Sequence, residues 1–581
     1  MADPTNSEIA AAMDELGDLY ELDGAVIHRI VAYRNAAKSI RDSSTSVAAL
    51  ARENRAIELP GIGGTLQEKI QALNDTGEIP ALVKLRGKFP PGLVEMTRLP
   101  GLGPKRARRL FDELGIDSLA ALRAAAEEHR IRDLKGFGAK AEEALIESLD
   151  AHDQEGPGRR TVLSQALKVG EELVAALRAH PAAQRVELAG SGRRMTETVK
   201  DLDIIATATD PKALAQAAAQ LPQVEQSSNP GENAVRIRTH SGLSVDVRIV
   251  APDQFGNLLQ HLTGSKQHNM ALRDFAVRRG LHISEYGVLD DATGTTHRCS
   301  TEEEVYALLG MDYIEPELRE DRGELEAALK HTLPDLVSLD DLRGELHSHT
   351  FASDGTASIA EMAAGAKAVG YEYLAITDHS ASMGFGADVS PEELKRQIEA
   401  IRSTQIEGIE LLAGSEVNIL PDGSLDYADE LLAELDWVIA SVHTSFRMSS
   451  AEMTARIITA IEHPNVDCIG HLSGRKLEQR APYEFDIEAI IDACARTGTL
   501  LEINSNPDRR DLNEVHARAA AAAGIPIVIN TDAHRIDGFE VARYGVATAR
   551  RAWLTADQIA NTKPWPELRA LLRRDHAAAG S

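Results

Sequence analysis

The chain has 581 residues, so several domains are expected, because one hydrophobic core rarely serves a chain of this length. Hydrophobic residues make up 43% and charged residues 26%, which excludes a disordered chain and a membrane protein. The net charge of −28 argues against a nucleic-acid partner on average, although charge can be distributed unevenly along a chain.

The first residues, MADPTNSEIA, lack the basic and apolar segments of a secretion signal, and no later stretch approaches the roughly 18 apolar residues of a membrane span. We therefore expect a cytoplasmic protein. The three cysteines, Cys299, Cys468 and Cys494, have no CxxC spacing, which argues against a disulfide framework and a thiolate zinc site. Any bound metal needs histidine and carboxylate ligands.

Residues 1–90 are predicted to form amphipathic helices, because apolar residues such as Ile9, Met13, Leu16 and Leu19 recur at helical spacing. A glycine-turn element recurs between helices, as LPGIGGTLQEKI, LPGLGPKRARRL and the weaker LKGFGAKAEEAL. In a G-x-G turn the backbone can approach a phosphate, and amides of the next helix can donate to it. For any single turn, a plain helix C-cap is the alternative.

The second glycine turn lies in a basic segment, since eight cations and one acid, Glu95, occur between Lys84 and Arg109. A solvated helix face is the alternative. Because the turn is repeated and cations follow it, we interpret these elements as helix-hairpin-helix motifs that grip DNA without sequence preference. The predicted DNA contacts are Gly61, Gly63, Gly101, Gly103, Lys105 and Arg106.

Lys69 lies in the helix after the first glycine turn. Its amine could form a Schiff base with an abasic sugar if neighbouring cations lower its pKa. A surface lysine is the plainer interpretation.

Beyond a Gly/Pro-rich stretch, the strand-like runs VELAG, DLDIIAT and LSVDVRIV alternate with helical segments, which predicts an α+β domain. Asp201 and Asp203 stand at i and i+2, so both project from one face of a strand. If the strand that carries Asp246 is a neighbour, three carboxylates can hold two divalent metals, as nucleotidyl transfer requires. The preceding GSGRR offers the Ser191 hydroxyl and the Arg194 guanidinium to a triphosphate. A solvated strand end is the alternative for the aspartates.

From Leu342 onward, short apolar strands alternate with Ala-rich helices, the pattern of a parallel βα barrel. Histidines and acids stand where these strands end, and strand ends of a barrel share one rim. These residues are His347, His349, Asp354, His379, Glu416, His443, His471, Asp532 and His534. Each alone could be a hydrogen-bonded surface group, but nine at successive strand ends indicate a site for more than one Mn²⁺, Zn²⁺ or Fe ion.

GSGRRMTETVKDLDII, LSVDVRIV and HLTGSKQHNMALRDFAVRRGLHISEYG resemble the palm and nucleotide-binding subdomain of the X-family DNA polymerases, the polymerase beta relatives. The similarity covers about residues 1–315. It implies metal roles for Asp201, Asp203 and Asp246, triphosphate contacts for Ser191 and Arg194, and nascent-pair or template contacts for Asn269 and Arg273. LPGIGGTLQEK is similar to the family's lyase hairpin and places Lys69 where its Schiff-base lysine stands.

Two positions depart from the family pattern. The family's Tyr-Phe before Thr-Gly-Ser is His261-Leu262 here, which removes aromatic packing near the sugar and bears on discrimination against ribonucleotides. A glycine often found before the first aspartate is Lys200, which can alter the triphosphate geometry. Neither change removes a metal ligand.

HSHTFASDG, TDHS, GSEVNI, SVH, GHLSGR and TDAH resemble the PHP domain, named for polymerase and histidinol phosphatase, a distorted seven-stranded βα barrel with a trinuclear metal centre. The resemblance implies three metals, held by His347, His349, Glu416 and Asp532, by Glu416, His443 and His471, and by Asp354, His379 and His534. Bound metals lower the pKa of water enough to give a nucleophile at neutral pH. Arg475 is expected to bind a phosphate oxygen, with a salt bridge as the alternative.

The sequence thus predicts a multidomain chain with helical, α+β and βα-barrel parts. The expected parts are a lyase-like, DNA-end-binding helical domain at 1–90, a helix-hairpin-helix subdomain at 91–152, a nucleotidyltransferase palm at 160–255, a nucleotide- and template-binding subdomain at 256–315, a linker at 316–340, and a distorted (βα)7 PHP phosphoesterase barrel at 341–575.

This order resembles bacterial X-family polymerases, which fill short gaps and trim 3′ ends. We expect template-directed dNMP addition at the palm with two Mg²⁺ or Mn²⁺ ions, and 3′–5′ exonuclease or related 3′-end hydrolysis at the barrel with up to three metals. The expected partners are gapped or nicked DNA and dNTPs, for a monomer that lies on the nucleoid when bound to DNA.

Two other interpretations stay open. The barrel could be the main activity, with a weak polymerase core that presents ends, which Lys200 and Leu262 favour. Alternatively, the chain could be a non-catalytic scaffold for gapped DNA, against which the complete sets of acids and histidines argue.

Overall fold

The computed structural model describes residues 3–41, 43–97, 99, 102–134, 137–138, 141–142, 145–146, 148–149, 160–382 and 388–573. The chain divides into two compact units. Unit 1 comprises Met1–Thr161, Gln165–Leu188 and Lys200–Pro252, and unit 2 comprises Val162–Ser164, Ala189–Val199 and Asp253–Ser581.

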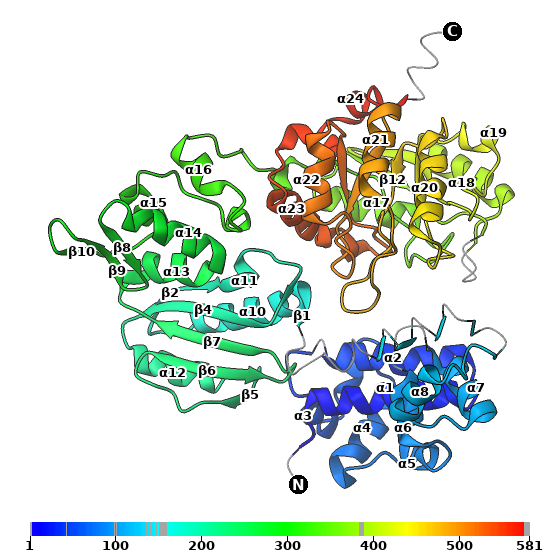
Figure 1. Cartoon of the computed structure of the whole chain (residues 1–581), viewed down its shortest axis with the longest axis horizontal. Coiled ribbons are helices and arrows are strands. Elements are labelled where there is room, and N and C mark those ends of the chain that lie inside the picture. The colour runs from blue at the N-terminus through cyan, green and yellow to red at the C-terminus, as the bar shows by residue number, and fades with distance from the viewer. Residues whose placement is uncertain are drawn as a thin grey trace. The chain divides into compact units, whose positions relative to one another are not determined.

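The N-terminal region is helical, as predicted. The Thr5 side chain accepts from the Glu8 amide, while the Glu8 carboxylate accepts from the Thr5 amide, and this capping box starts the first helix. Ile9, Met13 and Leu16 are fully buried on one face of that helix, in a core shared with its neighbours. The helices, shown in blue to cyan in Figure 1, are α1 (Asn6–Leu22), α2 (Ile27–Arg41), α3 (Val47–Arg52), η1 (Ala56–Glu58), α4 (Gly64–Thr76), α5 (Pro80–Arg86), α6 (Pro91–Thr97), α7 (Pro104–Leu114) and α8 (Leu119–Glu127).

Two glycine turns lead directly into helices. Gly61 has a φ of +78°, a left-handed conformation that favours glycine, and α4 follows Gly63. In the second turn, α7 follows Gly103. Among the described residues, no side chain caps either helix, and a Cβ added at Gly63 or Gly103 would meet no heavy atom within 4 Å. The start of each helix is therefore open to an approaching group. Gly101 and parts of the third predicted turn lie outside the described residues.

The α+β segment forms a five-stranded mixed sheet in the order β2-β4-β7-β6-β5. The strand β4 runs parallel to β7, whereas β6 is antiparallel to both β7 and β5. The elements of this segment are β1 (Thr161–Val162), α10 (Leu163–Arg178), β2 (Ala183–Ala189), α11 (Gly190–Arg193), β3 (Thr198–Val199), β4 (Asp201–Ala208), α12 (Pro211–Ala219), β5 (Val224–Ser227), β6 (Ala234–Thr239) and β7 (Ser244–Ile249).

The next segment combines helices with a three-stranded antiparallel sheet in the order β10-β9-β8. Its elements are η2 (Pro252–Gln254), α13 (Phe255–Thr263), α14 (Lys266–Val277), β8 (Leu281–Ser284), β9 (Gly287–Asp290), β10 (Thr295–His297) and α15 (Glu302–Leu308). The predicted linker contains η3 (Pro316–Leu318) and α16 (Glu324–Leu329). Arg550 binds Glu317 at 2.7 Å and Arg551 binds Glu320 at 2.9 Å, so this connector is fastened to the C-terminal segment within unit 2.

The C-terminal segment is a nearly closed parallel barrel, as the alternation of strands and helices predicts. Its seven strands neighbour one another in chain order: β11 (Gly344–Glu345), β12 (Tyr373–Ile376), β13 (Glu410–Asn418), β14 (Trp437–Ser441), β15 (Cys468–Ile469), β16 (Leu500–Asn504) and β17 (Ile527–Asn530). A parallel bridge between Ser348 and Ala533 links the segments that follow the first and last strands.

Apolar residues fill both faces of these strands, which explains their nearly continuous hydrophobic runs. Trp565 and Leu568 close the inner core. Helices surround the strands (Figure 1). These are η4 (Leu339–Asp341), α17 (Ile359–Ala368), α18 (Pro391–Ser403), α19 (Asp429–Leu432), α20 (Ser450–Glu462), α21 (Ile487–Thr497), α22 (Glu514–Ala522), η5 (Ile536–Val541), α23 (Ala542–Arg551), η6 (Ala556–Gln558), η7 (Ala560–Thr562) and α24 (Trp565–Arg569). Among the helices of the described ranges, none has both the length and the apolar content needed to cross a bilayer.

Candidate functional sites

The carboxyl ends of the barrel strands bring all nine predicted ligand residues to one rim. Seven of them are buried, whereas Asp354 and His534 are 43% and 33% exposed and form the solvent side. Each hydrophobic run forms a strand of the buried barrel wall. The residue that follows the run therefore lies at the carboxyl end of the strand, on the rim.

Glu416, fully enclosed at the end of β13, is the centre of the cluster. Both of its oxygens face imidazoles, Oε1 on one side and Oε2 on the other. The distances are 2.9 Å from Oε1 to His471 Nε2, 3.1 Å from Oε1 to His443 Nε2, 2.8 Å from Oε2 to His379 Nδ1, 3.4 Å from Oε2 to His347 Nε2 and 3.7 Å from Oε2 to His349 Nε2. One carboxylate therefore faces histidines from four different strand ends.

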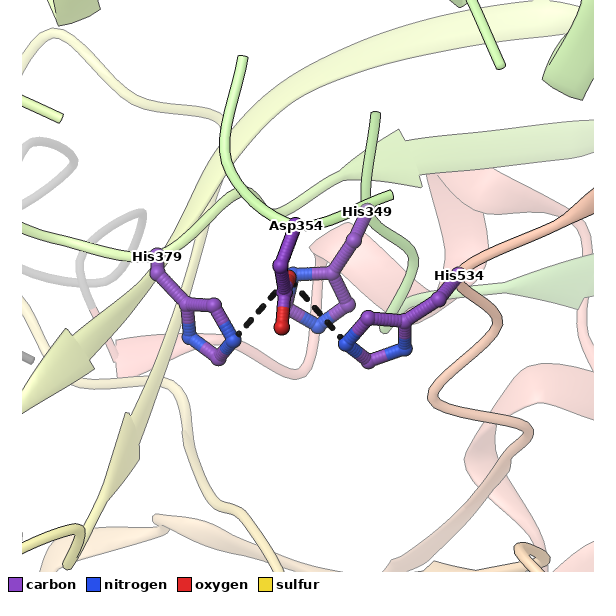
Figure 2. A group of neighbouring side chains, drawn as sticks. All are labelled: His349, Asp354, His379 and His534. Atoms are coloured by element: carbon purple, nitrogen blue, oxygen red, sulfur yellow. Dashed lines mark ion pairs between the residues drawn. The ribbon is translucent and has the colours of Figure 1, made fainter. Parts of the chain in front are cut away.

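A second group gathers around Asp354 (Figure 2). Its Oδ1 lies 3.3 Å from His379 Nε2 and 3.2 Å from His534 Nε2, and the ring of His349 stacks on that of His534. The ligand atoms of these four residues all lie within 4.8 Å of one another. Asp532 completes the rim, since its Oδ1 lies 3.2 Å from His349 Nε2.

The electrostatics of this rim suit cations. Within the described part of the chain, several buried ring nitrogens and both Glu416 oxygens make no hydrogen bond of favourable geometry despite the short distances, although burying such atoms unpaired is costly. Burial lowers the pKa of His349 to about 4, aided by the rings of His534 and His379, so its imidazole is neutral and can bind metal. Glu416 and Asp354 outweigh the burial of His379 and raise its pKa to about 10. Imidazoles and carboxylates arranged in this way fit divalent metals.

A cavity of about 300 Å³ opens beside the rim. Asp354, His379 and Asp532 line it together with three cations, Lys476, Arg480 and Arg509, and with Phe446. No motif singled out these three cations, although each lies within eleven residues of a strand end, a position that could have marked them.

Arg475, which is predicted to bind a phosphate oxygen, is not among the residues that line this cavity. Its guanidinium donates to both carboxylate oxygens of Glu197, at 2.5 and 3.1 Å, and to the Arg510 carbonyl. The side chain is only 11% exposed. Arg475 thus forms the salt bridge of its alternative interpretation, and its role in binding a phosphate oxygen stays a prediction.

In unit 1, the sheet register aligns the three predicted palm carboxylates. Asp203 on β4 pairs directly with Asp246 on β7, and Asp201 stands two residues before Asp203, so all three belong to one face. On the other side of β7, Arg236 of the antiparallel strand β6 stands opposite Asp246. Its guanidinium donates to both Asp246 oxygens, at 2.7 and 2.8 Å. Among the described residues, the groups whose ligand atoms all lie within 4.8 Å belong to the barrel, and the palm carboxylates are not among them.

In unit 2, the turn that carries Ser191 and Arg194 begins with α11 at Gly190, whose φ is +68°. Arg194 lies 3.1 Å from Glu320 and also donates to the Thr263 carbonyl. The neighbouring Arg193 holds the Thr263 hydroxyl at 2.8 Å. The turn is therefore fixed to the end of α13.

Asn269 and Arg273 of unit 2 are the predicted contacts to the nascent pair or the template. Both contact His261, one of the positions that depart from the family pattern. Asn269 donates to the His261 carbonyl at 2.7 Å, and Arg273 lies 3.0 Å from the His261 ring. His261 thus orients both side chains of α14.

The DNA-contact residues of the glycine turns stand at the open helix starts described above. Lys105 is exposed and Arg106 half-buried, and the Arg106 guanidinium lies over the Phe137 ring at 4.3 Å. Lys69 is a half-buried residue of α4, with its amine 3.5 Å from the Thr65 carbonyl. These roles stay predictions.

Models of four protein families match the chain. They describe a helix-hairpin-helix domain at residues 4–79, a SAM-like helix-hairpin-helix tandem at 93–151, a DNA polymerase beta thumb at 258–320 and a PHP domain at 345–506.

Curated relatives fall into two groups. The DNA polymerase/3′-5′ exonuclease PolX of Bacillus subtilis (strain 168) is 36% identical over 572 residues, which cover 98% of this chain and 99% of the relative. A probable phosphatase of Thermoanaerobacter sp. (strain X514) is 34% identical over 232 residues, 38% of this chain and 89% of the relative. A probable phosphatase of Shewanella sediminis (strain HAW-EB3) is 31% identical over 246 residues, 40% of this chain and 94% of the relative.

Proposed function

Because the chain belongs to the X-family DNA polymerases that carry a C-terminal PHP domain, we propose that it fills short gaps in DNA at the palm and hydrolyses 3′ ends at the barrel. The observation that supports the proposal is that one chain carries two separate groups of acidic or imidazole side chains that suit metal ions. One set is the pairing of Asp203 with Asp246, and the other is the cluster around Glu416.

At the palm, Asp201, Asp203 and Asp246 would hold two Mg²⁺ or Mn²⁺ ions. When bound, such ions activate a 3′-hydroxyl and neutralise the leaving pyrophosphate. Ser191 and Arg194 bind the triphosphate of the incoming dNTP, since a hydroxyl and a guanidinium suit phosphate oxygens. Asn269 and Arg273, which His261 holds together, contact the nascent pair or the template.

At the barrel, the nine rim residues would hold up to three Mn²⁺, Zn²⁺ or Fe ions, which supply Lewis acidity and an activated water when bound. Lys476, Arg480 and Arg509 line the cavity beside the rim and orient the phosphodiester of a DNA 3′ end. A cavity of about 300 Å³ stands at the small end of the range for ligand pockets, which favours a single terminal nucleotide.

The helix-hairpin-helix elements supply the grip on the DNA backbone, through the open helix starts at Gly63 and Gly103. We propose gapped or nicked duplex as the partner and a monomer as the working state. We propose that the Lys69 amine forms a Schiff base with an abasic sugar at the 5′ side of a gap.

The test is an assay on a gapped duplex labelled at the primer 5′ end, with Mg²⁺ or Mn²⁺ present, run with and without dNTPs. The proposal predicts extension of the primer when dNTPs are present and stepwise shortening from the 3′ end when they are absent. Absence of both reactions in a protein of verified metal content would refute it.

A second candidate, a barrel nuclease with a weak polymerase, draws support from two ion pairs. Arg236 occupies Asp246, and Glu320 pairs with Arg194, so two groups expected to contact substrate or metal carry protein partners. Primer extension discriminates the two candidates, because this one predicts shortening of the primer at full rate with little dNTP incorporation.

A further inference from the structure

Glu502, on β16, is a fully buried carboxylate next to the metal rim, yet it is not one of the nine ligand residues. Four donors surround it, two at each oxygen. They are His347 Nδ1 at 2.7 Å and Asn530 Nδ2 at 3.0 Å from Oε1, and the His471 amide at 2.7 Å and Asn504 Nδ2 at 3.2 Å from Oε2. These donors come from the ends of four different strands.

The donor set defines what Glu502 can do. An ionised carboxylate offers about four lone-pair positions. All four are filled here, so Glu502 has none left with which to bind a metal itself. Each partner offers it an N–H, which suits the ionised form. Glu502 therefore acts through its neighbours.

One of those neighbours is His347. Because Nδ1 donates its hydrogen to Glu502, the lone pair of this imidazole is on Nε2. That atom lies 3.4 Å from Glu416 and 3.6 Å from Asp532, at the centre of the rim, and has no hydrogen-bond partner. The hydrogen bond to Glu502 thus sets both the tautomer and the direction of His347.

A second neighbour is His471, whose backbone has a φ of +26°, a conformation that residues other than glycine rarely adopt. The bond from its amide to Glu502 holds that conformation in place. Asn504 extends the network to a third rim residue, since its amide nitrogen also lies 3.1 Å from Asp532.

The free-energy cost of burying the Glu502 carboxylate also supports a role beside bound metal. A buried carboxylate is expensive unless charge compensates it. No arginine or lysine of the described residues pairs with Glu502, whose partners are a histidine ring, two side-chain amides and a backbone N–H. Cations bound at the rim, one imidazole away, would supply the missing compensation.

We propose that Glu502 is a positioning residue of the barrel centre, which orients His347 and His471 and raises the affinity of the rim for divalent metal. This inference rests on the proposed metal centre and not on the identity of the DNA substrate. Carboxylates that orient metal-binding imidazoles commonly change metal affinity by about 10- to 100-fold when they are replaced.

The test is Glu502→Gln in the full-length chain. The amide places an NH₂ group against two of the four donors, so one half of the network is lost. We expect Mn²⁺ affinity, measured by competition with a chelator, to fall by about 10- to 100-fold. Bound metal after dialysis, measured by elemental analysis, should fall accordingly. Hydrolysis of 3′ ends should return towards the wild-type rate at high Mn²⁺, because Glu502 touches no substrate.

The matched control is Asp467→Asn, which also removes a buried charge from the barrel but lies before β15, away from the rim. It should keep wild-type metal affinity. Primer extension, which is proposed to depend on the carboxylates of unit 1 and on none of the barrel residues, serves as the folding control. If Glu502→Gln does not fold, Glu502→Asp decides, since the shorter side chain keeps the charge but cannot reach both His347 and the His471 amide.

Wild-type Mn²⁺ affinity in a folded Glu502 variant would overturn this inference, whatever the barrel hydrolyses. By contrast, a wild-type protein that binds Mn²⁺ at the barrel but hydrolyses no 3′ end would overturn the proposed function and leave the inference standing. The two failures therefore have different signatures.

Discussion

At Asp246, a single arginine competes with the cations that the carboxylate is proposed to hold. Arg236 donates to both of its oxygens, and its own side chain is 71% exposed. Exposed ion pairs contribute little to stability, because water and salt screen them. A divalent ion can therefore displace Arg236, but only by breaking the pair first.

Replacing this arginine should make metal binding easier. In Arg236→Met, we expect the Mg²⁺ concentration that gives half-maximal primer extension to fall by about two- to fivefold, since a screened pair is modest. Titration of Mg²⁺ in a steady-state extension assay measures it. Arg238→Met, on the same face of β6 but paired with Glu225, is the control and should leave the requirement unchanged. A higher Mg²⁺ requirement in Arg236→Met would mean that Arg236 helps to bind the substrate.

Sequence patterns located most site residues but not their orientation. The histidines could be predicted because each follows an apolar strand, and a barrel brings strand ends together. The salt bridge of Arg475 with Glu197 could not be predicted, since nothing in GHLSGR specifies the direction of a loop side chain. The positions of Lys476, Arg480 and Arg509 beside the cavity could not be predicted for the same reason. The pairing of Arg236 with Asp246 depends on the antiparallel register of β6 and β7, which no local pattern encodes.

At the scale of elements, the proposed contacts to phosphate come from the backbone amides at two helix starts rather than from side chains. The helices α4 and α7 follow glycines that provide no cap, so their first amides lack a side-chain acceptor. Elsewhere in the chain, Ser and Thr caps with Glu at the third position close the helix starts, as in α17, α18 and α20. This contrast distinguishes the two glycine turns from these capped helix starts.

The second turn provides a sharp test of that contrast. In Gly103→Asp, the new carboxylate can cap α7, because Gly103 has an ordinary φ of −68° and open space for a Cβ. The thermal midpoint should hold or rise slightly, while the negative charge repels a phosphate and weakens binding to gapped DNA by about tenfold.

Fluorescence anisotropy at several salt concentrations measures this affinity, and calorimetry measures the midpoint. The control is Gly103→Ser, which caps without charge and should bind DNA more tightly than Gly103→Asp does. Equal DNA affinities for Gly103→Asp and wild type would show that phosphate does not approach this helix start.

At the scale of the whole molecule, unit 2 joins the barrel, the connector and the turn that carries Arg194 into one compact body. Arg551, at the end of α23, is only 5% exposed and binds three partners. It donates to the Arg194 carbonyl at 2.8 Å, to Glu320 at 2.9 Å and to Glu514 at 3.1 Å. A buried charge of this kind needs all of its partners.

Removing that charge should loosen unit 2. In Arg551→Met, Glu320 and Glu514 each lose one arginine partner and keep a second, Arg194 and Arg322 respectively. We expect a destabilisation of about 2 kcal/mol, the size typical of losing hydrogen bonds to a charged group. Urea unfolding followed by tryptophan fluorescence reports on this unit, because Trp437, Trp553 and Trp565 all belong to it. Arg496→Met, which breaks an exposed pair with Glu462, is the control and should unfold with the wild type. A wild-type midpoint in Arg551→Met would place the stability of unit 2 elsewhere.

The fold class could be predicted because each part carries its own pattern: helical spacing up to α8, strands with polar ends in the palm, and alternating strands and helices in the barrel. The connector could not be read in this way. Its charged sequence suggested a plain linker, but Glu317 and Glu320 face Arg550 and Arg551, partners more than 200 residues away in the chain.

The central claim is that two metal-ligand sets in one chain perform two separable reactions, and the crossed pair of variants Asp246→Ala and His349→Ala tests it most directly. On one labelled gapped duplex with Mn²⁺, Asp246→Ala should lose extension and keep 3′-end hydrolysis, whereas His349→Ala should lose hydrolysis and keep extension. Loss of both reactions in either well-folded variant would contradict the claim.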